Sequence, residues 1–544
     1  MHLPDATDVL IVGGGPVGLA LAAELGWRGV SCILVELRGR PVVHSKMNLV
    51  NVRTMEFCRR WGVADQVRNA PFPDDHPHDV AFVTSMTGHE LGRLARPAAR
   101  ARDVTRHSPE TYHHCPQMWF DPILQEFCDT LPTVMLRHRC RLVQFRAEAD
   151  RVVADVADEA TGARATVTAR YLVGCDGALS EVRAAVGIGL EGTGTLGRSM
   201  HGFFRTTALP RAPGIGNAIR YMLVGTEGVW ANLLSIDGRD LWRFAITRVP
   251  DDAEADDFDM EARLRHAVGR DFPHEWRGTL AWTRRQLVAE RYGCGRVFLA
   301  GDAAHQLSPT GGFGMNTGIG DAVDLGWKLD AVLKGWGGPW LLDAYDLERR
   351  PVGWRNVTAA GENYRLWVVP QQCERLDEEG PDAAERRRAV GEALADSLRI
   401  EFDSEGVQLG YRYDPSPLCV PDGTAPPPDD PVSYVPVARP GSRAPHVAIE
   451  NARSTLDLFG RGFTLLRLGT QAPDAGALAA AAAARGVPLV VATLDHPDVT
   501  AAYEKALVLV RPDGHVAWRS DSLPPDCFAL VDRVRGAGAR VARR

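Results

Sequence analysis

A glycine-rich turn close to the N-terminus has the residue types and the spacing of a dinucleotide-binding site. Gly13, Gly15 and Gly18 fit the pattern GxGxxG. The first glycine would permit a tight turn, the second would let a pyrophosphate approach the backbone, and the third would let a helix pack against a sheet. That helix would follow the turn, so its positive end and its free N–H groups would face the phosphates. Glu36, at the end of the next apolar run, would accept hydrogen bonds from an adenosine ribose.

The sequence around this turn supplies the elements that must hold it. Residues 8–12 and 31–35 are apolar runs typical of strands, and the segment from the turn to Leu25 is rich in small residues compatible with a helix. This order predicts a βαβ unit. Glycine-rich turns also serve packing alone, but the strand, the helix and the acidic residue together favour dinucleotide binding.

A second glycine-rich segment, residues 301–316, follows the apolar run 296–300. Asp302 would lie at the end of that strand, where its carboxylate could accept hydrogen bonds from a polyol chain. The glycines would let the backbone lie against a flat ring, and the helix that begins near Met315 would direct its positive end toward that ring. Because NAD has no polyol chain, this segment favours FAD as the bound dinucleotide.

A third motif, the Asp-Gly pair within residues 175–183, completes an ordered set. With these motifs the chain resembles the group A flavoprotein aromatic hydroxylases, the superfamily of para-hydroxybenzoate hydroxylase and phenol hydroxylase, over nearly its whole length. The resemblance implies an FAD-dependent monooxygenase that uses NADH or NADPH and O2 to hydroxylate a phenolic substrate through a flavin C4a-hydroperoxide. The alternative is a Baeyer–Villiger or epoxidising monooxygenase that acts on a polycyclic natural product. A non-catalytic flavoprotein would have no need of the second glycine-rich loop.

The resemblance also implies contacts between individual residues and the flavin. Asp302 would bind the ribityl chain, and Pro309 would lie near the edge of the ring. Gly314 belongs to a flexible loop that would let the flavin move between two positions. The backbone of Met315 and Asn316 would bind the pyrimidine end of the flavin.

Further residues match the superfamily in spacing. Asp176 belongs to the fingerprint that the superfamily uses for FAD and, indirectly, for NAD(P)H. Arg53 would approach the FAD phosphates, and Gln117 would meet the ribityl and pyrophosphate region. The alternatives are a surface salt bridge for Arg53 and a loop amide for Gln117.

His44 is the predicted catalytic residue. It lies in a stretch where some phenol-oxidising relatives place a histidine beside the flavin and the substrate. An imidazole can accept the phenol proton near neutral pH, and the phenolate is the more electron-rich ring needed for electrophilic oxygen transfer. The alternative is a loop histidine bonded to the backbone.

Shifts in composition along the chain predict several domains. Short strand-like runs between Gly and Pro turns in residues 192–248 indicate an inserted antiparallel sheet, and the Pro-rich stretch 414–432 is typical of a semi-rigid linker. The predicted fold is α/β, with a Rossmann-like FAD-binding domain of the GR2 type, an antiparallel-sheet substrate domain and a C-terminal thioredoxin-like domain. Without a CxxC pair, the last domain is expected to be structural or dimer-forming. The predicted boundaries are 1–75, 103–190 and 285–410 for the FAD-binding domain, 76–102 and 191–284 for the substrate domain, 411–440 for the linker, and 441–544 for the thioredoxin-like domain.

Composition and charge exclude several classes of function. The 544 residues are 45% apolar and 24% charged, as in globular proteins that bury more than one core. A net charge of -7 argues against binding to nucleic acid. The His-rich segments 76–78 and 113–114 lack zinc-like spacing, so no metal site is expected. The apolar run 9–25 is too interrupted to span a membrane. We therefore expect a cytoplasmic homodimer that binds a small phenolic or polycyclic aromatic substrate.

Overall fold

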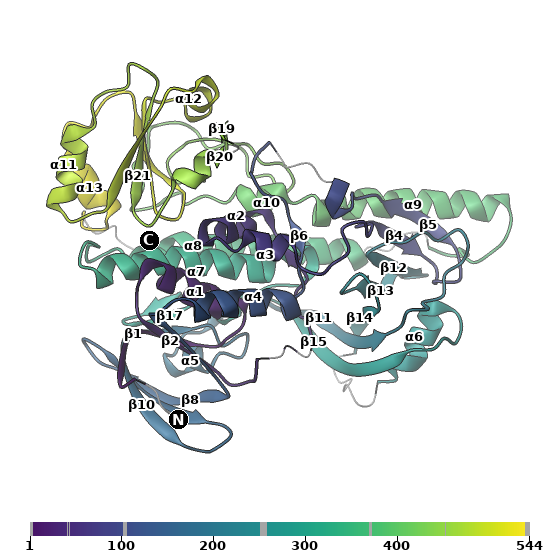
Figure 1. Ribbon diagram of the computed structural model, residues 1–544. Coiled ribbons are helices and arrows are strands. Elements are labelled where there is room, and N and C mark those ends of the chain that lie inside the picture. The colour runs from purple at the N-terminus through teal and green to yellow at the C-terminus, as the bar shows by residue number, and fades with distance from the viewer. Residues whose placement is uncertain are drawn as a thin grey trace.

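The computed structural model describes residues 4–538, except 41, 43, 102–105, 251–257, 369–372 and 452 (Figure 1). Among these residues two eight-stranded sheets form the body of the molecule, and a four-stranded sheet forms a C-terminal unit. In Figure 1 the first sheet lies at the lower left, the second at the right, and the C-terminal unit at the upper left. The α/β class and the three parts predicted from the sequence are confirmed.

The first sheet holds the predicted βαβ unit. β1 pairs in parallel with both β2 and β10, and Val9, Leu10 and Ile11 are fully buried, as expected for a parallel strand covered on both faces. The order is β16-β17-β10-β1-β2-β7, and β8 and β9 extend from β10. The strands are β1 (Ala6–Val12), β2 (Cys32–Glu36), β7 (Val134–His138), β8 (Cys140–Ala147), β9 (Val152–Asp158), β10 (Arg164–Gly174), β16 (Gly293–Cys294) and β17 (Val297–Leu299).

The helix after the first turn has clear start and stop signals. α1 (Pro16–Arg28) has Gly15 as its N-cap and proline in its first turn, where the missing N–H costs no helical hydrogen bond. It ends at Gly29, whose φ of 81° is the left-handed conformation that favours glycine. The helix therefore starts at the glycine-rich turn and directs its N-terminus toward the space above β1.

The second sheet is the predicted antiparallel one, with a single parallel pair, β12 with β4, among the described strands. Its order is β18-β15-β11-β14-β13-β12-β4-β5. β18 follows directly after the turn that carries Asp302, so this sheet is joined to the second glycine-rich segment. The strands are β4 (Val80–Val83), β5 (Glu90–Leu94), β11 (Leu190–Arg205), β12 (Arg220–Gly225), β13 (Gly228–Ser235), β14 (Leu241–Val249), β15 (Glu275–Ala289) and β18 (His305–Gln306).

Long helices connect the three parts. α7 packs on α1 over the first sheet, and the far side of α7 shares a hydrophobic core with the C-terminal unit through Trp327, Leu341 and Phe463 (Figure 1). Two short strands, β3 (Leu49–Val50) and β6 (His113–His114), pair with each other beside the cavity described below. The helices are α2 (Val52–Trp61), α3 (Ala64–Arg68), α4 (Gln117–Asp129), α5 (Glu181–Ala185), α6 (Met260–Val268), α7 (Phe313–Leu333), α8 (Asp343–Val368), α9 (Pro381–Phe402) and α10 (Glu405–Leu409).

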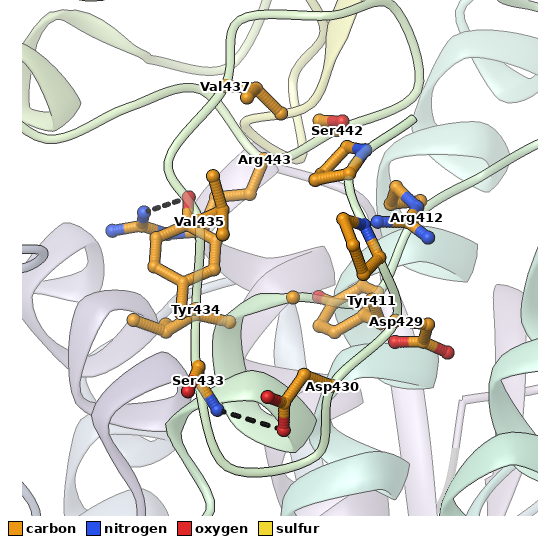
Figure 2. A pocket seen from close by; sticks show the side chains of 14 residues that line it. Tyr411, Arg412, Asp429, Asp430, Ser433, Tyr434, Val435, Val437, Ser442 and Arg443 are labelled. Carbon is orange, nitrogen blue, oxygen red and sulfur yellow. Dashed lines mark hydrogen bonds between the residues drawn. The ribbon is translucent and has the colours of Figure 1, made fainter. Parts of the chain in front are cut away.

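The C-terminal unit has the strand order β22-β21-β23-β24. The sequence pattern predicts four strands, at residues 463–468, 488–493, 506–510 and 516–519, and a helix at residues 477–484, and the structure has all five. The two short helices that follow β22 and β24 were not predicted. Between this unit and α10 runs an irregular segment that folds around the Tyr434–Arg443 hydrogen bond and a cavity of only about 20 Å³ (Figure 2). The elements are β21 (Phe463–Leu468), α11 (Gly476–Ala484), β22 (Leu489–Leu494), α12 (Pro497–Tyr503), β23 (Leu507–Val510), β24 (Val516–Ser520) and α13 (Cys527–Val534), with a small ribbon of β19 (Ala448–Ile449) and β20 (Arg453–Ser454).

Candidate active site

A cavity of about 340 Å³ lies between the carboxyl end of the first sheet and the face of the second sheet. We call its first side the glycine wall, which consists of Gly15, Asp302, Pro309, Gly314 and Met315. We call the opposite side the sheet wall, which consists of Ile219, Arg220, Leu234, Arg243 and Trp282. Such a position outside the carboxyl ends of parallel strands is where open α/β sheets bind their ligands.

The three glycines of the first motif divide into two roles. A Cβ on Gly13, whose φ is +107°, would lie 2.3 Å from the carbonyl oxygen of Cys175, and a Cβ on Gly18 would lie 2.0 Å from that of Gly13. These two positions must be glycine for the turn to pack. A Cβ on Gly15 would meet nothing within 4 Å, because this residue faces the open cavity. The space at Gly15 is therefore available to a ligand that approaches the backbone.

Glu36 lies at the end of β2, beside this turn. Its carboxylate accepts hydrogen bonds from the backbone N–H of Gly14 at 2.6 Å and of Arg38 at 2.8 Å. Each carboxylate oxygen keeps a further lone pair, so the group can also accept from a ribose hydroxyl. The structure brings Glu36 to the expected place next to the glycine-rich turn.

Asp302 extends from the turn after β17 into the cavity. Its side chain is exposed to the cavity, and desolvation by the surrounding protein raises its pKa in spite of His305 and Lys46. An acceptor in this position suits the hydroxyl groups of a polyol. Pro309, Gly314 and Met315 continue the same wall, and a Cβ on Gly314 would meet nothing within 4 Å.

Asn316 lies behind the glycine wall. Its side-chain oxygen accepts from the backbone N–H of Asn51 at 3.0 Å and from the hydroxyl of Thr54 at 2.8 Å, and its amide nitrogen donates to the carbonyl of Gly312 at 2.8 Å. The side chain thus ties the start of α7 to the start of α2. Asn316 therefore holds the loop in place, and its side-chain amide is already hydrogen-bonded within the protein.

Gln117 and Asp176 lie at opposite edges of the cavity. Gln117 lines it at the start of α4, accepts from the backbone N–H of Lys46 at 3.2 Å and donates to Asp121 at 2.9 Å. Asp176 accepts from the N–H of Val182 at 3.0 Å and from the hydroxyl of Ser180, and so fixes the loop before α5. Its chain neighbours line the cavity, but its own carboxylate points into that loop.

Arg53 is not among the residues that line the cavity. Its guanidinium is buried, ion-pairs with Glu56 at 2.7 Å, and donates to Tyr411 at 3.3 Å and to the carbonyl of Asp513 at 2.8 Å. These partners lie on the side of α2 that faces the C-terminal unit. Arg53 therefore joins two parts of the chain, and its approach to the FAD phosphates stays a prediction.

His44 also lies outside the cavity lining. Its ring stacks on Phe203 with centroids 4.4 Å apart, and a Cβ on Gly278 would lie 3.3 Å from its Nε2. Burial lowers its pKa, so the ring is neutral near pH 7. The structure places this histidine against strands β11 and β15, outside the lining residues of the cavity, and its catalytic role stays a prediction.

The sheet wall contains a charge that the sequence analysis missed. Arg243 lies on β14 between the buried Trp242 and Phe244, and its Nε has no hydrogen-bond partner among the described residues. Burial, together with the neighbouring Arg220 and Arg284, lowers its pKa to about 9. Its position within the otherwise apolar run 241–246 is the signal in the sequence that could have identified it.

Two more residues of the cavity come from distant parts of the sequence. Glu401, at the end of α9, accepts from the N–H of Gly311 at 3.3 Å and ion-pairs with Arg220 at 3.1 Å. Trp282 of β15 lies parallel to His201 of β11, with ring centroids 6.0 Å apart. The carboxylate joins the two walls, and the indole adds a flat apolar surface.

The residues present fit a bound FAD. The open space at Gly15 suits a pyrophosphate, Glu36 suits a ribose, and Asp302 suits the ribityl chain. The open position at Gly314 leaves room for a ring against the start of α7. Fold and cavity together define a flavoprotein of the GxGxxG type.

Comparison with known proteins agrees with this class. Residues 6–360 match the family described as FAD binding domain, and residues 437–537 match the family described as aromatic-ring hydroxylase, C-terminal. The chain belongs to the group A FAD-dependent aromatic hydroxylases, and it is an FAD-dependent monooxygenase. FAD is its cofactor, and members of this family use NAD(P)H and O2.

Individual relatives match over almost their full length. A putative polyketide hydroxylase of Streptomyces halstedii is 35% identical over 542 residues, which cover 95% of this chain and 94% of that protein. A 4-methyl-5-nitrocatechol 5-monooxygenase of a Burkholderia species is 34% identical, with coverage of 99% and 98%. The solved structure of the rebeccamycin biosynthetic enzyme RebC with reduced flavin has a TM-score of 0.91 and 42% identity, with coverage of 99% and 100%.

Membrane-spanning helices and metal sites are both absent from the described part of the chain. No helix there is long and apolar enough to cross a membrane. No group of three or more His, Cys, Asp or Glu side chains there is arranged to hold a metal ion.

Proposed function

We propose that the protein uses NAD(P)H and O2 to hydroxylate the phenolic ring of an aromatic substrate that carries an anionic group. The observation that carries this proposal is the state of Arg243 in the sheet wall. Its guanidinium borders the cavity, and among the described residues it forms no ion pair. The nearest charges are the like charges of Arg220 and Arg284.

Arg243 is partly buried, and a cation in this position without a partner is unfavourable, because burial removes part of its hydration and nothing replaces it. A carboxylate or phenolate of a bound substrate would supply the missing charge and a paired hydrogen bond, for which the planar guanidinium is well suited. Arg284 adds to the positive potential, and its own pKa is lowered to about 10 by burial. The charge would thus orient the substrate as well as attract it.

The other residues of the cavity would position a flat substrate and exclude water. Ile219, Leu234 and Trp282 give the sheet wall an apolar surface on which an aromatic ring can lie. When bound and reduced, FAD supplies the electrons that activate O2. The sheet wall would hold the ring facing the glycine wall, and Glu401 would fix the loop between them through the N–H of Gly311. The relatives named for a polyketide and for 4-methyl-5-nitrocatechol support an aromatic substrate.

A panel of phenols, aromatic carboxylic acids and polyketide-like aromatics tests this proposal. We expect the anionic members to stimulate oxidation of NADH or NADPH, and the product to contain a single ¹⁸O atom when the reaction runs under ¹⁸O2. Nuclear magnetic resonance of the product should show a new ring hydroxyl, whereas a lactone or an epoxide would favour the Baeyer–Villiger or epoxidising alternative. Release of all the consumed electrons as H2O2 with every member of the panel would contradict the proposal.

A further inference from the structure

A second aspartate, Asp321, holds the turn that carries Asp302. Asp321 of α7 is fully buried and accepts from the backbone N–H of Gly301 at 3.1 Å, from Nε2 of His305 at 2.6 Å and from Nε of Arg349 at 2.8 Å. Burial opposes ionisation of this carboxylate, but His305 and Arg349 outweigh burial and lower its pKa. Because two of its donors flank Asp302, the position of Asp321 fixes the position of Asp302.

Arg349 of α8 connects Asp321 to residues that lie farther from the cavity. Besides Asp321, its guanidinium donates to the carbonyl of Thr317 at 2.9 Å and to the hydroxyl of Tyr413 at 3.5 Å. The ring of Tyr413 packs against His515, with ring centroids 4.3 Å apart. His515 belongs to the turn between β23 and β24, so these contacts lead from the glycine wall to the C-terminal unit.

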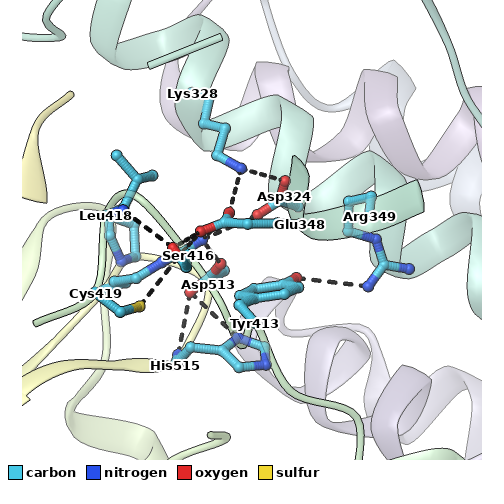
Figure 3. A network of polar contacts seen from close by, with 12 residues as sticks. Asp324, Lys328, Glu348, Arg349, Tyr413, Ser416, Leu418, Cys419, Asp513 and His515 are labelled. Atoms are coloured by element: carbon cyan, nitrogen blue, oxygen red, sulfur yellow. Dashed lines mark hydrogen bonds and ion pairs between the residues drawn. The ribbon is translucent and has the colours of Figure 1, made fainter. Parts of the chain in front are cut away.

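The same turn is anchored on α7 and α8 by a buried ionic cluster (Figure 3). Arg511 donates to both oxygens of Glu348, at 2.6 and 2.9 Å, to Asp513 at 2.6 Å and to Asp324 at 3.1 Å. Lys328 bridges Asp324 and Glu348 at 2.5 and 2.6 Å. Burial opposes ionisation of Glu348, but Arg511 and Lys328 together lower its pKa to about 2. α7 and α8 therefore share one cationic partner that comes from the C-terminal unit.

We propose that the C-terminal unit completes the flavin site, with Arg511, Arg349 and Asp321 acting as positioning residues for the Gly301–Asp302 turn. Arg511 fixes the position of α7 relative to α8. Through their hydrogen bonds, Asp321 and Arg349 then fix the position of the Gly301–Asp302 turn relative to these two helices. None of these side chains lines the cavity, so they act on FAD through Asp302 and the backbone beside it. Rigid support of this kind is what keeps binding groups within a fraction of an ångström of their productive geometry.

This role differs from general stabilisation, because it concerns one turn in the cavity. Arg53, which donates to the carbonyl of Asp513, ties the same C-terminal turn to α2. Arg519, on the adjacent strand β24, is also buried and is ion-paired with Asp422 at 2.6 Å and with Glu504 at 2.7 Å. Its partners lie outside α7 and α8, so it provides a matched control in the same unit.

The experiment compares Arg511→Gln, Asp321→Asn and Arg519→Gln in the full chain. FAD is titrated into each apo-protein, the dissociation constant is taken from the quenching of flavin fluorescence, and the Tm of each apo-protein is measured separately. We expect Arg511→Gln and Asp321→Asn to weaken FAD binding by about tenfold or more, and Arg519→Gln by less than about twofold at a comparable loss of Tm. The readout is FAD binding, so it does not depend on the identity of the substrate.

An unchanged dissociation constant in Arg511→Gln, or an equal increase in Arg519→Gln, would overturn the proposal, since affinity would then be independent of this turn or would only follow stability. If Arg511→Gln does not fold, Tyr413→Phe removes only the hydroxyl that accepts from Arg349. We expect this variant to weaken FAD binding by about threefold. A wild-type constant in Tyr413→Phe would then overturn the proposal.

Discussion

The two walls of the cavity present different chemistry to what lies between them. The glycine wall offers backbone and empty space, and at Gly15 and Gly314 the absence of a Cβ is what leaves room for a ligand. The sheet wall offers large side chains, with the flat indole of Trp282 and the unpaired cation of Arg243. The first wall therefore recognises a ligand by shape, and the second by charge and by an apolar surface. Substitutions should affect the two walls in different ways.

The largest effects are expected at the first glycine-rich turn, which supplies Gly15 to the glycine wall. Gly18→Ala should destabilise the apo-protein, because its Cβ would lie 2.0 Å from the carbonyl oxygen of Gly13. Gly15→Ala should leave the apo-protein intact, since the added methyl group would meet no protein atom within 4 Å. It should nevertheless weaken FAD binding by about a hundredfold, because the methyl group enters the space of the pyrophosphate. Thermal unfolding and FAD titration of both variants check this contrast, which would be lost if Gly15→Ala lowered Tm as much as Gly18→Ala.

The next effect is expected at the sheet wall. Arg243→Met should lower kcat/KM for an anionic aromatic substrate by about thirtyfold or more, because a charge-assisted hydrogen bond is lost. For a neutral analogue of the same shape, the loss should be much smaller. Arg239→Met, at an exposed position in the loop before β14, serves as the control. Equal losses for the anionic and the neutral substrate would remove the charge of Arg243 from substrate recognition.

A smaller effect is expected in the pH dependence of FAD binding, which depends on Asp302 of the glycine wall. Burial raises the pKa of Asp302 above the ordinary value of 3.8, and the ionised form is the better acceptor for the ribityl hydroxyls. FAD affinity should therefore fall on acidification, beginning at a higher pH than for an ordinary aspartate. The stability of the apo-protein should respond to this group with the opposite sign, because a raised pKa in the folded state contributes stability that is lost as pH rises. Asp302→Asn should bind FAD less tightly and should remove this part of both pH profiles.

The smallest effect is expected at His44. Because the ring stacks on Phe203 and lies outside the cavity lining, His44→Ala should change kcat/KM and the coupling of NAD(P)H oxidation to hydroxylation by less than about twofold. Stopped-flow reduction and measurement of H2O2 release check this outcome. Strong uncoupling in this variant would restore the catalytic role that the sequence predicted for His44.

The same contrast explains which parts of the site could be predicted from the sequence. Gly13, Gly15 and Gly18 act within six consecutive residues, so the local pattern is sufficient to identify them. Arg243 and Glu401 line the same cavity only because the second sheet and the end of α9 fold together. No local sequence pattern predicts that these two residues line one cavity, because they are far apart in the chain.

Arg53 shows the limit of spacing as an argument. Its position in the sequence is that of a phosphate-binding arginine, but its guanidinium bonds to the carbonyl of Asp513, which is 460 residues away. The C-terminal unit supplies partners that a reading of residues 51–56 does not contain. In the same way, the short helices α12 and α13 were missed because their stability comes from packing on the small sheet more than from local sequence.

The most direct test of the central claim is the dissociation constant for FAD in Arg243→Met, measured beside Gly15→Ala. If the glycine wall binds the cofactor and the sheet wall binds the substrate, Arg243→Met should bind FAD within about twofold of the unaltered protein, while Gly15→Ala binds it far more weakly. If Arg243→Met weakened FAD binding as much as Gly15→Ala, the unpaired cation would belong to the cofactor site. The division of the cavity into two walls would then be wrong.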